Sequence, residues 1–161
     1  MNIFALDSDP IKAAVFLCDK HVVKMFLESV QILSTVARIH GKEAPYKSTH
    51  LNHPATRWTA AKAENWFWLV AHAEAIGKEY ARRYGKVHKS TTHLETLKSM
   101  SEELFSGHSQ NWIGHDPFAQ CMPEEIRSED AVEAYRNYYI KNKSNIAKWK
   151  LGNVPDWFAG K

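Results

Sequence analysis

The segment from Ala55 to Tyr84 places the strongest constraint on the fold, because it is predicted to be a long helix with apolar residues on every side. At about 100° per residue, its large apolar side chains point in nearly every direction. A helix that is apolar all round is buried, so other helices have to surround it. These side chains are Trp58, Trp66, Phe67, Trp68, Leu69, Val70, Ile76 and Tyr80.

The rest of the chain also favours helices. Asp9 is a suitable N-cap and Pro10 a suitable first residue for a helix that reaches about His40, with a break near Cys18 and Asp19. Residues 93–105 and 128–142 are predicted to form further helices, residues 106–123 a loop, and "MNIFAL" an edge strand or an extended arm. No strand-like alternation of any length appears. We therefore predict an all-α fold, a compact single-domain helical bundle over residues 1–161, with an extended N-terminal arm and a buried central helix.

Composition excludes several classes of protein. With 44% hydrophobic and 24% charged residues, the chain is typical of globular proteins and unlike disordered ones. No apolar run approaches the ~18 residues of a membrane span, and the N-terminus lacks the features of a signal peptide. Cys18 and Cys121 match neither a disulfide framework nor a zinc finger. We expect a cytoplasmic monomer with reduced thiols and no membrane partner.

The net charge of +3 is unevenly distributed along the chain. Residues 78–90 carry five Lys and Arg side chains against one Glu, and residues 136–150 carry five without any acid. Both stretches also contain aromatic residues, a pattern that favours contact with an anionic polymer such as DNA. The alternative is that these cations only solvate helix faces.

Four polar residues share one side of the first long helix. His21, Lys24, Glu28 and Gln31 fall within roughly 80° of one another on a helical wheel. They could form an exposed face with a Lys24–Glu28 ion pair. The residues beside them are apolar, however, so the carboxylate and the imidazole are also candidates for shifted pKa values and acid–base catalysis.

The predicted central helix has a polar face of its own. Arg57, Asn65, His72 and Glu79 lie within about 80° of one another on this otherwise apolar segment. Buried polar groups need partners, since each unpaired one costs roughly 1–3 kcal/mol. These residues either satisfy one another and nearby backbone, or they meet the polar face of the first helix and form the floor of a cleft.

The sequence contains no motif for a metal or a nucleotide cofactor. Histidine pairs occur in three places, but none matches a zinc pattern such as HExxH, and no carboxylate cluster accompanies them. A Gly-rich phosphate loop and a Gly-x-Ser-x-Gly elbow are both absent. We predict no metal ion and no cofactor.

The whole chain resembles a family of small bacteriophage proteins, on stretches that include "CDKHVVKMFLES", "NHPATRW", "NWFWL", "EYARRYGKVHKS", "AQCMP", "AYRNYY" and "VPDWF". Its first helix is also similar to that of the phage pyrimidine-dimer DNA glycosylases known as endonuclease V, through Asp19, His21 and Glu28. In that family an Asp-x-His start is followed, seven residues after the His, by a catalytic Glu. The resemblance implies a small all-α enzyme with a basic, aromatic-rich C-terminal part, acting in the infected host cell.

The resemblance also implies covalent catalysis by an amine. In that family the α-amine of an N-terminal Thr, exposed by removal of the initiator Met, attacks the sugar C1′ and forms a Schiff base. Here Asn2 follows Met1, and an initiator Met is normally removed only before small residues, so the expected nucleophile is the amine of Met1. Lys24 is a second candidate. Leu27 stands where that family has an arginine directly before the catalytic Glu, which weakens the expectation of dimer specificity.

We therefore expect a DNA N-glycosylase, with or without abasic-site lyase activity, that acts on damaged or modified bases in phage or host DNA. The candidate catalytic residues are Glu28, His21, Lys24 and Met1. DNA would be held through its phosphate backbone and a flipped base. The candidate nucleic-acid-binding residues are Asn2, His53, Arg57, Asn65, His72, Arg83, Lys86, His88, Lys89, Tyr135 and Arg136.

Three alternatives remain open at this point. The basic stretches also suit a non-catalytic nucleic-acid-binding protein. A closed pocket formed by the two polar helix faces would suit a small-molecule enzyme that acts on a nucleotide or a modified nucleoside. Exposed aromatic residues would suit a phage protein that binds a host protein.

Overall fold

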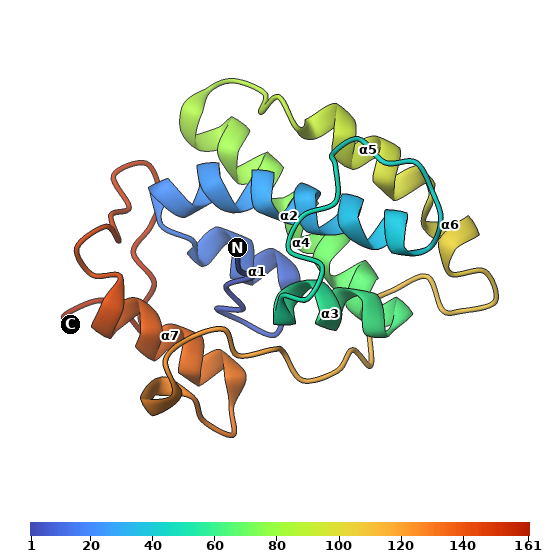
Figure 1. The fold of residues 1–161 in the computed structure, drawn as a ribbon. Coiled ribbons are helices and arrows are strands. Elements are labelled where there is room, and N and C mark those ends of the chain that lie inside the picture. The colour runs from blue at the N-terminus through green and yellow to red at the C-terminus, as the bar shows by residue number, and fades with distance from the viewer.

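A computed structural model describes all 161 residues and contains seven α-helices, one short 3-10 helix and no strands (Figure 1). The prediction of an all-α fold is therefore confirmed. The helices are α1 (Pro10–Phe16), α2 (Asp19–Ile39), α3 (Pro54–Ala61), α4 (Ala63–Tyr84), α5 (Thr91–Ser99), α6 (Ser101–Leu104), η1 (Glu124–Ile126) and α7 (Ala131–Asn142). None of them is long and apolar enough to cross a membrane.

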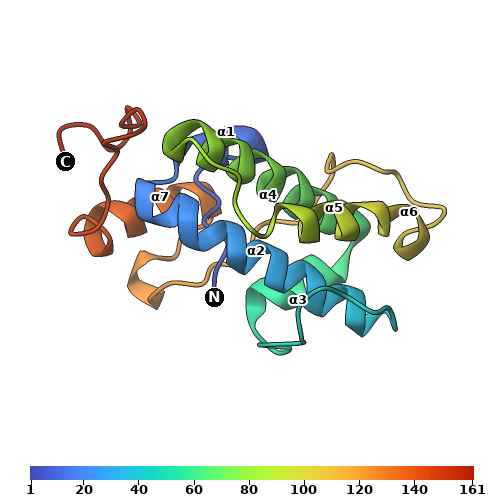
Figure 2. The same ribbon diagram turned by 90° about the horizontal axis from the view of Figure 1, so that it is seen from above.

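Helix α4 lies at the centre of the molecule, in contact with α1, α2, α3 and α5 (Figures 1 and 2). Trp66, Trp68, Leu69 and Ile76 of this helix are completely buried, although they point to different sides. The predicted buried central helix is thus present. Gly77 of α4 lets the ring of Phe26 approach, since a Cβ there would lie 3.1 Å from the ring. Helices α2 and α4 are therefore packed closely at this point.

The prediction of one continuous helix over residues 55–84 is wrong, because the helix is interrupted at a single residue. Lys62 is extended (φ −157°, ψ 144°) and separates α3 from α4. No proline or glycine marks this break. The side chain of Asn65 compensates for it, because its Nδ2 donates to the carbonyl oxygen of Trp58 at 2.7 Å. The predicted break near Cys18, by contrast, is confirmed between α1 and α2.

The N-terminal residues form an extended arm and no strand. Ile3, Phe4, Ala5 and Leu6 are all buried in the main hydrophobic core. The start of the arm is held by Asn2, whose Nδ2 donates to the carbonyl of Cys121 at 3.0 Å. The chain end that carries Met1 is therefore fixed in the protein surface.

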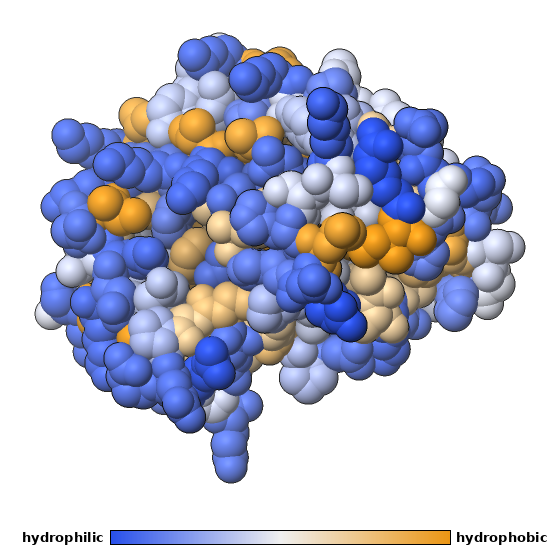
Figure 3. Space-filling view, viewed as in Figure 1, coloured by the Kyte–Doolittle hydropathy of each residue, from blue (hydrophilic) through white to orange (hydrophobic).

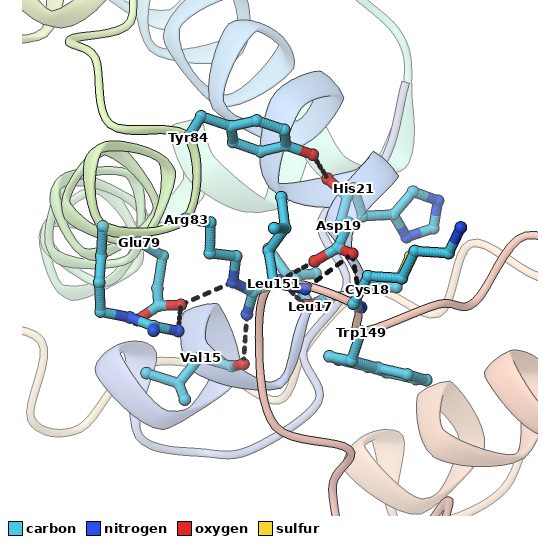
Figure 4. Close-up of polar contacts among 12 residues, drawn as sticks. Val15, Leu17, Cys18, Asp19, His21, Glu79, Arg83, Tyr84, Trp149 and Leu151 are labelled. Atoms are coloured by element: carbon cyan, nitrogen blue, oxygen red, sulfur yellow. Dashed lines mark hydrogen bonds and ion pairs between the residues drawn. The ribbon is translucent and has the colours of Figure 1, made fainter.

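A buried cluster of charges joins the α1–α2 junction, the end of α4 and the C-terminal segment (Figure 4). The guanidinium of Arg83 donates to Glu79 at 2.8 Å and to the carbonyls of Leu17 and Val15 at 2.7 and 2.9 Å. It also lies 3.3 Å from Oδ1 of Asp19. These contacts satisfy the carbonyl groups that the end of α1 leaves free.

Asp19 extends the cluster to the C-terminal segment. Its Oδ2 accepts hydrogen bonds from the backbone N–H groups of Lys150 and Leu151, at 2.8 and 3.3 Å. The chain passes so close to Arg83 here that a Cβ on Gly152 would lie 2.9 Å from the guanidinium carbon. The cluster thus places the first turn of α2, which carries His21, against the C-terminal part of the chain.

Candidate active site

A cavity of about 430 Å³ opens where the N-terminal arm meets α2, the start of α3, the loop before η1 and the end of α7. The N-terminus lies on the face of the molecule shown in Figure 3, where polar side chains dominate and apolar ones are visible in the hollows. The lining residues are Met1, Asn2, Phe4, His21, Lys24, Met25, Glu28, His53, Pro54, Gln120, Cys121, Met122, Arg127, Tyr138 and Lys143. All four predicted catalytic residues are among them.

The amine of Met1 and the carboxylate of Glu28 form an ion pair in this cavity. The nitrogen lies 3.3 Å from Oε1 of Glu28. Glu28 is only 9% exposed, and its second oxygen, Oε2, is buried without a hydrogen-bond partner. An unpaired buried carboxylate oxygen is costly, by about 1–3 kcal/mol or more. This oxygen can accept a hydrogen bond from a ligand in the cavity.

His21 is held rigidly beside this pair. Its ring stacks on Phe4 with the centroids 4.4 Å apart, and its Nδ1 lies 2.6 Å from the hydroxyl of Tyr139. Burial and, to a smaller extent, the positive charges of Lys143 and Lys24 lower the pKa of His21 from 6.5 to about 4. The imidazole is therefore neutral at physiological pH.

His53 faces the same cavity from the start of α3. Its Nδ1 accepts a hydrogen bond from the backbone N–H of Ala55 at 3.1 Å and caps the helix. Burial lowers the pKa of His53, as do the N-terminal amine and His50, while Glu28 acts in the opposite direction. Because Nδ1 is an acceptor, the neutral ring carries its proton on Nε2. One N–H group is thus available on the far side of the ring.

Lys24 differs from the other three candidates because its side chain is exposed to solvent. It lies on the rim of the cavity, one helical turn before Glu28. The predicted Lys24–Glu28 ion pair is absent, since the partner of Glu28 is the amine of Met1. The face of α2 that carries these residues is accordingly half buried against the arm, and not a plain solvated face.

Two of the arginines predicted to bind DNA have structural partners instead. Arg83 is 6% exposed and its guanidinium is occupied by the charge cluster described above. Arg136 donates to the carbonyl of Leu6 at 2.8 Å and to Asp7 at 3.1 Å, and lies over the rings of Phe16 and Trp157. A phosphate would have to displace these contacts, and the contact of both arginines with DNA stays a prediction.

Four uncharged candidates are also buried and bonded within the protein. Asn65 closes the α3–α4 break, and Nδ1 of His72 bonds the carbonyl of Pro10 at 2.9 Å. His88 accepts from the N–H of Ser90, and the hydroxyl of Tyr135 donates to the carbonyl of Ala119 at 2.6 Å. These bonds give each of the four a structural role, and their contact with DNA likewise stays a prediction. Tyr135 also bonds Asn2 and thereby helps to fix the arm.

The remaining candidates are accessible. Arg57, Lys86 and Lys89 are exposed, and Asn2 and His53 line the cavity. Arg57 also lines a neighbouring open groove of about 760 Å³, which shares Pro54 with the cavity. No group of three or more His, Cys, Asp or Glu side chains is arranged to hold a metal ion.

The second wall of the cavity contains none of the predicted site residues. It is lined by Gln120, Cys121, Met122, Arg127, Tyr138 and Lys143, and Phe4 of the arm was not predicted either. The one available signal was the basic, aromatic character of residues 136–150, which does not reveal which face of α7 is turned to the cavity. Burial raises the pKa of the Cys121 thiol, so this cysteine is present in its neutral form.

Comparison with known proteins identifies the family. A family model described as pyrimidine dimer DNA glycosylase matches residues 1–96, more than half of the chain. Among curated proteins and solved structures, none matches. The matched region contains the arm, α2 with His21 and Glu28, and the start of α3 with His53. The chain belongs to the pyrimidine dimer DNA glycosylase family, whose members are enzymes with DNA as their substrate.

Proposed function

We propose that this protein, acting as a single domain and a monomer, removes a damaged pyrimidine from DNA by covalent catalysis at the Met1–Glu28 pair. The observation that carries the proposal is the 3.3 Å contact between the amine of Met1 and Glu28 inside a cavity. An amine and a buried carboxylate side by side provide a nucleophile and a group that can take its proton.

The chemistry would proceed in two steps. The uncharged amine attacks the sugar C1′ while the bond from C1′ to the base breaks, and the base leaves with the bonding electrons and takes up a proton. Glu28 accepts the proton that the attacking nitrogen releases. The C1′–O4′ bond then breaks as O4′ takes up this proton from Glu28, and the lone pair of the nitrogen forms a protonated Schiff base with C1′, from which abasic-site lyase activity would follow.

Met1 is better placed than Lys24 to act as the nucleophile. The amine of Met1 lies against Glu28, whereas Lys24 is exposed on the rim and has no carboxylate partner. We assign Lys24 to electrostatic attraction of the DNA strand. The arm, held through Asn2, keeps the amine in position between turnovers.

His21 would serve as a positioning residue. Its neutral ring cannot supply a positive charge at physiological pH, and its contacts with Phe4 and Tyr139 are those of a rigid support. Nε2–H of His53, on the opposite side, is a donor that could hydrogen-bond Glu28 or the substrate. Arg57, Lys86 and Lys89 would contact phosphates, and the target nucleotide would have to leave the base stack to reach the cavity.

Cleavage of a duplex with a single cyclobutane pyrimidine dimer tests the proposal. Glu28→Gln should bind this duplex as the wild type does, yet lose turnover. Glu95→Gln, which alters an exposed acid on α5, is the matched control and should cleave normally. Unchanged cleavage by Glu28→Gln would contradict the mechanism. Binding without cleavage by the wild type on dimer, abasic and modified-base duplexes would favour a non-catalytic DNA-binding protein instead.

A further inference from the structure

One wall of the cavity is built from a part of the chain that the family model does not match. The match ends at residue 96, whereas Gln120, Arg127, Tyr138 and Lys143 come from the loop before η1, the residue after it, and the region of α7. The family match therefore gives no information about this wall, and its features have to be read from the structure.

The cavity has three cationic side chains and one acidic side chain. Lys24, Arg127 and Lys143 line it, and Glu28 is the only acid among the lining residues. Since Glu28 is already paired with the amine of Met1, the three cations have no acidic counterpart there. Such a cavity attracts an anionic ligand.

The guanidinium of Arg127 donates a hydrogen bond to the protein from one of its three nitrogens only. Its Nε donates to the carbonyl of Met122 at 3.1 Å, which fixes the direction of the side chain. The two terminal nitrogens donate no hydrogen bond to the protein, and the residue is exposed. A planar guanidinium with its outer N–H groups unused is well suited to bind two oxygens of a phosphate.

Lys143 is the second cation of this wall. Its ammonium lies 4.9 Å from the ring centre of Tyr138, over an aromatic stack that continues through Phe4 to His21. Like Arg127, Lys143 forms no ion pair with a carboxylate, so its charge is available to a ligand. A cation–π contact of this kind contributes only about 0.5–1 kcal/mol at a partly exposed site, and a phosphate would compete with it readily.

The two cations lie near opposite ends of α7. Arg127 precedes the helix by four positions and Lys143 follows its last residue, Asn142. Both nevertheless line the same cavity, so its wall carries two cations from separate parts of the chain.

We propose that Arg127 and Lys143 bind phosphates of the DNA strand that enters this cavity. The inference rests on the proposed function, since it takes DNA as the ligand of this cavity. It also explains how the strand is held although Leu27 precedes Glu28 and although Arg83 and Arg136 are engaged within the protein. The phosphate contacts at the cavity thus come from the C-terminal wall.

The salt dependence of binding tests this assignment. The affinity for a short duplex with one cyclobutane pyrimidine dimer is measured at a series of KCl concentrations for the wild type, Arg127→Gln, Lys143→Gln and the double variant. Each phosphate contact contributes about 0.9 to the slope of log K against log[salt]. We expect each single variant to lower the slope by about that amount and the double variant by about twice as much.

Lys12→Gln is the matched control, because Lys12 is an exposed lysine of α1 outside the cavity. The slope of log K against log[salt] for this variant should equal that of the wild type. A wild-type slope in the double variant would overturn the inference. Turnover of Glu28→Gln is measured separately. If the Arg127 and Lys143 variants lower the salt slope but Glu28→Gln turns over normally, the phosphate contacts are supported and the proposed mechanism is refuted. Thermal unfolding of each variant confirms that the fold is intact.

Discussion

Replacement of Arg83 by methionine tests whether this arginine is structural, as its surroundings indicate, or a DNA contact, as the charge pattern of the sequence suggested. The side chain is fully buried and holds together Glu79, Asp19 and the carbonyls of Leu17 and Val15. Burial acts to raise the pKa of Glu79, but hydrogen bonds and charge from Arg82 and Arg83 outweigh it and lower that pKa. The carboxylate of Glu79 is therefore ionised, and both it and Asp19 are in contact with the guanidinium.

Removing one partner of a buried ion pair typically costs about 3–5 kcal/mol. For a chain of this size, each kcal/mol shifts the midpoint of thermal unfolding by roughly 2–4 °C. We therefore expect Arg83→Met to lower the free energy of unfolding in urea by about 3–5 kcal/mol and the thermal midpoint by roughly 6–20 °C. The loss is large compared with the ~5–15 kcal/mol of a typical domain.

Arg82→Met is the matched control for this experiment. Arg82 is the preceding residue of α4 and also bonds Glu79, at 2.9 Å, but its side chain is half exposed. Exposed ion pairs contribute only about 0–1 kcal/mol, so this variant should remain close to the wild type in stability. A destabilisation by Arg83→Met no larger than that of Arg82→Met, together with weaker DNA binding, would refute the structural role.

Three further predictions concern the site and the pH dependence of stability. His53→Ser should leave stability nearly unchanged, because serine also caps α3. The variant should reduce turnover, because it lacks the Nε2–H donor to Glu28 or the substrate. Turnover equal to that of the wild type in a cleavage assay would exclude this role. Adding a glycine before Met1 should abolish cleavage while duplex binding persists, since the attacking nitrogen moves away from Glu28; full activity would exclude Met1. Burial lowers the pKa of His72 from 6.5 to about 4, so stability should fall as the pH drops from 6.5 towards 4, by roughly 3 kcal/mol from this residue. Urea titrations should show a smaller fall for His72→Gln, and an unchanged pH dependence would contradict this origin.

Much of the fold could be predicted because its signals are local. Asp9 and Pro10 mark the start of α1, and Asp9 does cap it, with Oδ1 2.8 Å from the N–H of Ile11. The apolar surface of α4 required its burial. The break at Lys62 has no such signal. It depends on Asn65, which stabilises the free carbonyl of Trp58 only once the chain has folded.

The candidate site was predictable only on one side. Helical spacing brought His21, Lys24 and Glu28 together on α2, and all three line the cavity. The opposite wall depends on how residues 120–143 cross the arm, a long-range arrangement that no periodicity encodes. Charge did not predict the site for the same reason, because most of the partners of Arg83 and Arg136 come from the first twenty residues of the chain, far away in sequence.

We propose that the amine of Met1, activated by Glu28, attacks the sugar. Borohydride reduction during turnover of a dimer-containing or abasic duplex, followed by peptide mapping, tests this step most directly. We expect a covalent protein–DNA adduct at the α-nitrogen of Met1 that is lost in Glu28→Gln. An adduct that maps to Lys24, or efficient strand cleavage without any trapped adduct, would contradict it.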